Sequence, residues 1–139
     1  MSASAGGARD ELDARVNAIE EAYEFFLAYA SQGLPSDQGS GSGSQVRDYL
    51  RRCDGALNGL GGCIMRFVEH LGIDSTAYRA YVNVVDRDAL DASAGIQLVL
   101  AQPAIGSQLI DNLNASIHLR ALLTDLFLID EALKTAGRA

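Results

Sequence analysis

Apolar residues recur at steps of four and three along most of this chain, and this spacing restricts its fold more than any other feature. Such residues fall on one side of an α-helix, whereas a strand requires alternation at every second position. The spacing runs through four segments, at the following positions: Leu12, Val16, Ile19, Tyr23, Phe26 and Ala30; Val46, Leu50, Cys53, Leu57, Leu60, Ile64, Phe67 and Leu71; Tyr78, Val82, Val85, Ala89, Ala92, Ile96 and Val99; Leu109, Leu113, Leu119, Leu122, Leu123, Leu126, Ile129 and Leu133. No strand-length window alternates Val, Ile or Thr with polar residues. The sequence therefore predicts an all-α protein, an antiparallel bundle of about four helices.

Helix-ending signals separate the first segments. Gly33 followed by Pro35 ends a helix, because Gly adopts the left-handed turn and Pro cannot continue the helix. The first predicted helix therefore spans 9–32, and Gly72 ends the second in the same way. Residues 35–44 are rich in Gly and Ser, which predicts a flexible loop between helices one and two.

The later boundaries are less marked. The acidic residues between 86 and 91 leave open whether the third predicted helix is continuous, and Pro103 suits the first turn of the fourth. We expect a single helical-bundle domain over residues 9–136, after a disordered N-terminus of residues 1–8.

The charge balance disfavours two classes of partner. The chain has 11 Lys and Arg against 18 Asp and Glu, for a net charge of −7. Nucleic acids and anionic membranes are both bound by clustered basic side chains, so we expect neither. No apolar stretch is long enough to span a bilayer, and the N-terminus lacks the pattern of a signal peptide. We therefore expect a cytoplasmic protein in which Cys53 and Cys63 are free thiols.

Three glycines mark a candidate partner-binding surface. Gly55, Gly59 and Gly62 fall opposite the apolar side of the second predicted helix, and each Gly in a helix costs about 1 kcal/mol relative to Ala. Missing side chains let another helix approach closely, and the flanking Arg52 and Arg66 would fix its register by charge. The alternative is that the helix kinks or breaks near residues 59–62.

The fourth predicted helix carries a second apolar stripe besides its core positions. Its members are Ile110, Leu113, Ile117, Ala121 and Leu128. A helix at the surface of a bundle needs only one stripe, so two predict burial on both sides. That burial arises either across a homodimer interface or at the centre of a monomer. Asp111 and Asp125 are interpreted as solvent-facing carboxylates.

No set of catalytic residues can be assembled from this sequence. It contains no nucleophile motif, no phosphate-binding loop and no paired metal ligands, so we expect no enzyme activity, no metal and no cofactor. We expect instead a non-catalytic interaction protein, a homodimeric accessory or regulatory subunit that binds a protein partner. The alternative is a bundle that binds a small ligand or haem through His70, His118 and Asn112.

Overall fold

The computed structural model describes residues 5–138, and over that range the chain is all-α, as the sequence predicts. Six helices occur among the described residues where about four were predicted: α1 (Ala5–Ala30), α2 (Gly43–Leu57), α3 (Leu60–Leu71), α4 (Thr76–Leu100), α5 (Ser107–Ala115) and α6 (His118–Arg138). The first helix begins at Ala5 rather than at residue 9. The remainder of the predicted disordered segment, residues 1–4, lies outside the described residues.

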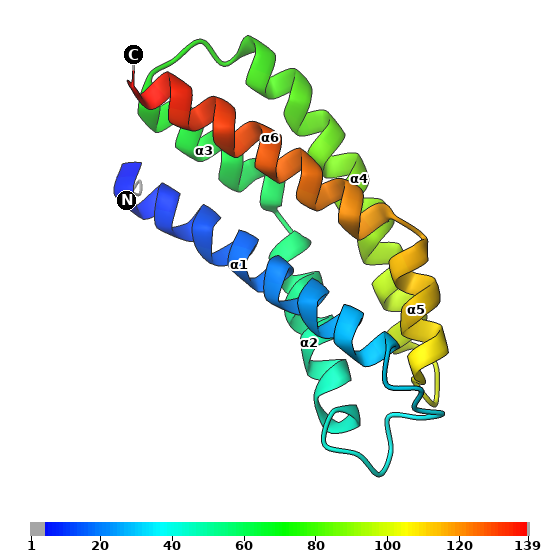
Figure 1. The fold of residues 1–139 in the computed structure, drawn as a ribbon. Helices are drawn as coiled ribbons and strands as arrows, with labels where there is room; N and C mark the ends of the chain where they lie inside the picture. The colour runs from blue at the N-terminus through cyan, green and yellow to red at the C-terminus, as the bar shows by residue number, and fades with distance from the viewer. Residues whose placement is uncertain (1–4, 139) are drawn as a thin grey trace.

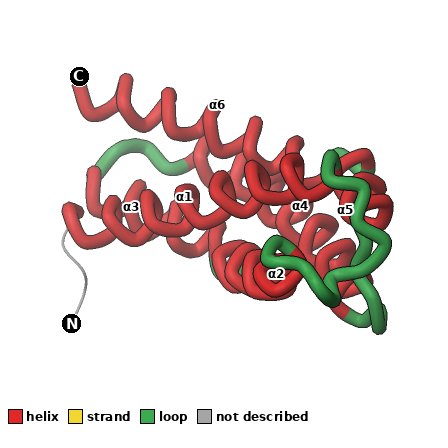
Figure 2. Tube along the Cα trace, turned by 60° about the horizontal axis from the view of Figure 1, so that its bottom comes forward, coloured by secondary structure: helices red, strands yellow, loops and turns green. Residues whose placement is uncertain are grey.

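Three long helices, α1, α4 and α6, set the length of the molecule (Figure 1). The α4 and α6 helices run antiparallel side by side, and α2 and α3 pack against both α1 and α4. Figure 2 shows that the two longer loops gather at the end of the bundle formed by α5 and the start of α2. The beginning of α1 and the end of α6 are both at the opposite end.

The core confirms the periodic pattern. Every residue of the four apolar series is buried or partly buried, and all six helices contribute. The four series omit several core residues, among them Tyr29 and Ile105, which are fully buried. Tyr29 lies one position before the last member of the first series. Its hydroxyl donates a 2.6 Å hydrogen bond to the carbonyl of Ile105, which satisfies the buried polar atom.

The prediction of one continuous helix across Val46–Leu71 is wrong. The helix breaks at Asn58, which is extended, and Gly59, whose φ of +78° is open to Gly without strain. The break exposes carbonyl groups that a continuous helix would have paired. The guanidinium of Arg15 on α1 donates to two of them, those of Ala56 and Asn58.

The fourth predicted helix is also two helices, so its continuity was wrongly predicted. It begins at Ser107 rather than near Pro103, and it is interrupted at Ser116 and Ile117. Ile117 has a φ of +63° and is the one residue other than Gly with a positive φ among those described. This conformation is strained for a β-branched residue. By contrast, α4 is continuous through its acidic residues.

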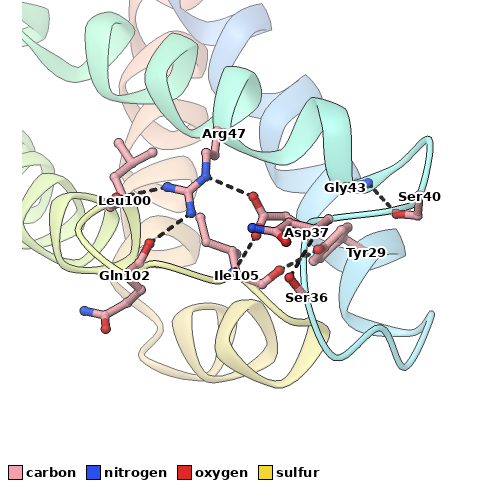
Figure 3. Close-up of polar contacts among 10 residues, drawn as sticks. Tyr29, Ser36, Asp37, Ser40, Gly43, Arg47, Leu100, Gln102 and Ile105 are labelled. Carbon is pink, nitrogen blue, oxygen red and sulfur yellow. Dashed lines mark hydrogen bonds and ion pairs between the residues drawn. The ribbon is translucent and has the colours of Figure 1, made fainter.

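A polar network fastens the Gly/Ser segment, which forms the loop between α1 and α2 (Figure 3). The Asp37 carboxylate accepts hydrogen bonds from the backbone N–H of Ile105, at 2.8 Å, and from Nε of Arg47, at 2.9 Å. Arg47 also donates to the carbonyls of Leu100 and Gln102 at the end of α4. The flexibility predicted for residues 35–44 stays a prediction.

Candidate functional site

The three glycines of the predicted partner surface do not share one continuous helix face. Gly55 lies in α2, Gly62 lies in α3, and Gly59 forms the break between these helices. Gly55 and Gly62 are exposed, and a side chain at Gly55 would meet nothing within 4 Å. The premise of the predicted glycine surface is therefore wrong, because the alternative, a break in the helix, is what the structure contains.

The two flanking arginines already have partners within the chain. Arg52 pairs with Asp48 at 2.6 Å in the same helix, and Arg66 pairs with Glu11 of α1 at 2.9 Å. The buried glycine of this region is Gly61, which sequence reasoning missed. A Cβ on Gly61 would overlap the carboxylate of Asp86 from α4, so this glycine allows α4 to approach α3.

A polar hollow of about 530 Å³ opens where the end of α2 and the break that follows it face α4. Its lining includes Asp54, Gly55, Gly59, Asp86, Leu90 and Ser93. Asp54 accepts a hydrogen bond from the Ser93 hydroxyl, which joins α2 to α4. Its two carboxylates give this hollow a negative character.

Two of the three predicted ligand-binding residues come together. Asn112 of α5 and His118 of α6 line one largely apolar hollow of about 510 Å³, whose walls include Ala94, Leu98, Val99, Leu109 and Leu113. His70 is in the last turn of α3 and does not line it. Figure 1 places the end of α3 and the start of α6 at opposite ends of the bundle. The three residues therefore do not form a single site.

Exposed apolar side chains lie along α4 and α6. We call this surface the α4–α6 face, and it consists of Ala77, Ala80, Tyr81, Val84, Arg87, Asp88, Asp91, Ala94 and Leu98 of α4 with Ile117, Arg120, Ala121, Thr124, Asp125, Leu128 and Ala132. Its large apolar side chains are far from covered, since Leu98 is 66%, Ile117 59% and Leu128 57% exposed. The second stripe predicted for the fourth helix is thus partly realised: Ile117 and Leu128 face solvent, whereas Ile110 and Leu113 are buried in the monomer.

A pair of carboxyl groups lies within this apolar surface. Asp125 of α6 is only 8% exposed, so its prediction as a solvent-facing residue is wrong. The Tyr81 hydroxyl donates a 3.1 Å hydrogen bond to its Oδ1, while Oδ2 is buried without a donor among the described residues. Burial and then the neighbouring carboxyl of Asp88 raise the pKa of Asp125 to about 7. The carboxyl is therefore partly protonated near neutral pH.

The sequence did hold a signal for the burial of Asp125. Asp125 lies three positions from Leu122 and four from Ile129, both of which are core residues, so its own position faces the neighbouring helix. Which side chain covers it depends on how α4 packs against α6, and the sequence does not show that.

The two cysteines are buried and free, as expected. Burial raises the pKa of the Cys53 thiol to about 12 and also raises that of Cys63. The thiol form is unreactive as a nucleophile, so neither side chain resembles an activated cysteine.

Among the residues that the structure describes, no helix is long and apolar enough to cross a bilayer, and no group of three or more His, Cys, Asp or Glu side chains is arranged around a common point where a metal ion would bind. Comparison of this chain with protein families, with curated proteins and with solved structures finds no match.

Proposed function

We propose that this protein is a non-catalytic interaction protein, a homodimeric accessory or regulatory subunit that binds through its α4–α6 face. The observation that supports this function is the exposure of Leu98, Ile117 and Leu128 along α4 and α6. Large exposed apolar side chains among charged groups are typical of protein–protein interfaces.

The energetics favour this surface over the glycines of α2 and α3. Covering a Leu or Ile side chain that is exposed contributes up to about 1.5–3 kcal/mol, whereas exposed glycines offer little apolar area to bury. Large apolar anchors at the centre of a patch, surrounded by polar groups, are also where binding energy concentrates in protein interfaces.

The test is to place a charge on the face. Leu128→Glu should abolish self-association and the recovery of partner proteins, measured by native mass spectrometry of the protein isolated from its own cells. Leu90→Glu is the matched control, because Leu90 is 71% exposed on α4 but lines the polar hollow opposite the end of α2. Circular dichroism verifies that both variants fold.

The opposite pattern would reject the α4–α6 face. If Leu128→Glu leaves association intact while Leu90→Glu or Gly55→Leu disrupts it, the binding surface lies over α2 and α3, where the sequence placed it. If no variant changes the native mass and no partner is recovered with the wild type, the interaction function itself fails.

One observation favours a second candidate, the binding of a small ligand. The hollow of about 510 Å³ that Asn112 and His118 line is within the size range of small-molecule sites and is mainly apolar. In that case the purified chain would carry a few hundred additional daltons, or the absorption spectrum of haem, and Asn112→Leu or His118→Leu would lose it. A colourless protein of unmodified mass from its own cells would count against this candidate.

A further inference from the structure

We infer that the occupant of the α4–α6 face is a second copy of this chain, with Arg87 and Arg120 of each copy facing the Asp88 and Asp125 carboxyl groups of the other. This inference rests on the proposed function and names the contacts that select the partner. The α4–α6 face is then an isologous interface, in which one patch meets the same patch across a two-fold axis.

Charges of both signs lie unpaired on this face. Arg87 and Arg120 are exposed, and neither forms an ion pair or side-chain hydrogen bond with another described residue. Arg47 and Arg66, by contrast, are held by carboxylates. Beside Arg87 and Arg120 lie Asp88 and Asp125, and neither of these carboxyl groups forms an ion pair with a described residue. A cation brought beside them by another molecule would offset the repulsion between the two carboxyl groups.

A hollow beside Asp125 leaves room for a side chain from another molecule. It measures about 330 Å³ and is lined by Ile117, Arg120, Ala121, Thr124 and Asp125. Arg120 cannot fill it in the manner of a helical ion pair, because it precedes Asp125 by five positions and helical neighbours are three or four apart. A guanidinium that enters from another molecule has no such restriction.

The mixture of charges matches a second copy better than a partner of one charge sign or an apolar partner. A basic helix would satisfy Asp88 and Asp125 but repel the two arginines, and an acidic partner would do the reverse. A purely apolar partner would bury all four groups unpaired, at a large desolvation cost. A copy of the same face offers two cations and two carboxyl groups, and it covers Leu98, Ile117 and Leu128 with equivalent apolar side chains.

The experiment exchanges charges and then mixes the variants. Arg87→Glu combined with Arg120→Glu should raise the dissociation constant of the dimer at least about tenfold, as should Asp88→Lys alone, because each places like charges opposite each other. When the two variants are mixed, opposite charges meet again and a heterodimer should form, which native mass spectrometry identifies by its mass. Arg51→Glu is the control, since Arg51 is an exposed arginine of α2 outside the face.

Three outcomes overturn the inference. In the first, the Arg87→Glu, Arg120→Glu variant forms a dimer as stable as that of the wild type. In the second, the mixed variants form no heterodimer. In the third, the wild-type chain is a monomer. If Asp88→Lys fails to fold by circular dichroism, Asp91→Lys on the same face replaces it in the mixture. The wild-type chain could instead be a monomer that binds a different protein, and Leu128→Glu could abolish that binding. This result would refute the inference and leave the proposed interaction function standing.

Discussion

The carboxylate of Asp37 accepts a 2.8 Å hydrogen bond from the backbone N–H of Ile105, and this bond fastens the loop after α1 to the loop after α4 (Figure 3). Ile105 is fully buried, so its N–H has no access to water as an alternative partner. Ser107 strengthens the same junction, because its hydroxyl donates to the carbonyl of Tyr29 at 2.6 Å. A segment that is poor in apolar side chains is therefore positioned by hydrogen bonds.

Replacing this carboxylate should destabilise the fold. Asp37→Ala is expected to lower the free energy of unfolding by about 2–3 kcal/mol, because the Ile105 N–H and the Arg47 guanidinium both lose their acceptor. Urea unfolding at pH 7 measures the change. Asp48→Ala is the control, since Asp48 pairs with an arginine at the surface and should contribute less than about 1 kcal/mol. Equal losses in the two variants would contradict the assigned role of Asp37.

The contribution of Asp37 should also depend on pH. The hydrogen bond from Ile105, and to a smaller extent Arg47, holds the pKa of Asp37 below its usual value against the opposing effect of burial. A carboxyl group with a lowered pKa in the folded state stabilises the fold above its unfolded pKa of about 4, and this contribution disappears as the pH falls through the folded value. The difference in unfolding free energy between the wild type and Asp37→Ala should therefore shrink between about pH 5 and pH 2. A constant difference would argue against an ionised Asp37 in the folded state.

Two glycines of α2 should respond in opposite ways to the same substitution. Gly55→Ala is expected to raise the unfolding free energy by up to about 1 kcal/mol, because its Cβ would enter open space and Ala favours the helix. Gly43→Ala should lower it by about 1–3 kcal/mol, because its Cβ would overlap the backbone carbonyl of Asp37. Thermal unfolding of both variants tests this contrast. A stabilised Gly43→Ala would mean that the loop readily moves away from α2.

Periodicity was sufficient to predict the core but not the two helix breaks. Leu57 and Leu60 keep the step of three across the first break, so the apolar pattern continues while the backbone does not. The side chain that stabilises this break belongs to Arg15 of α1. Arg15 is distant in the sequence, so the residues around 57–60 do not indicate its role. A break near residues 59–62 was the alternative that the sequence left open, because glycines are unfavourable within a helix.

The candidate site was less predictable than the fold for a related reason. An apolar stripe at Ile117 and Leu128 could be recognised from spacing, and it does mark the exposed surface of α6. The carboxyl pair could not be recognised from spacing, because Asp88 and Asp125 meet only through the packing of α4 on α6. The sequence therefore located an apolar surface but not the charged groups within it.

Asp125 should make the fold less stable as the pH rises. Its pKa of about 7 in the folded state lies above the unfolded value of 3.8, so between these values the folded chain holds a proton that the unfolded chain has released. The contribution of Asp125 to the free energy of unfolding therefore falls from about pH 4 to pH 7 and then levels off. The groups that face this carboxyl are Tyr81 and Asp88 of α4, with Arg120 at the rim of the hollow.

Asp125→Asn should remove this pH dependence. At pH 8 the variant is expected to be more stable than the wild type by on the order of 1–2 kcal/mol, because it buries no ionised carboxylate, and at pH 4 the two should be equal. Urea unfolding at protein concentrations that keep the chain monomeric measures both values. Asp111→Asn serves as the control because Asp111 is exposed. If the difference in unfolding free energy between the wild type and Asp125→Asn is the same at pH 4 and pH 8, the ionisation of Asp125 does not destabilise the fold.

Ile117 offers a test that separates folding from association. Ile117→Gly should raise the unfolding free energy of the monomer by about 0.5–1 kcal/mol, since the gain from relieving a positive φ exceeds the entropic cost of Gly in the unfolded chain. The same variant should weaken the dimer, because it deletes an exposed apolar side chain of the α4–α6 face. Ala115→Gly, at the end of α5, is the control and should only destabilise. A destabilised Ile117→Gly would contradict the strain at this position.

At Ile117 the backbone conformation and the proposed contact surface therefore favour different amino acids. The turn between α5 and α6 favours an amino acid without a side chain, whereas the proposed contact surface favours a large apolar one. The chain carries isoleucine, so the monomer gives up some of its folding free energy and keeps the apolar side chain facing outward. In the dimer that we propose, that side chain would be covered, and the strain of the turn would be a small part of the cost of building a contact surface.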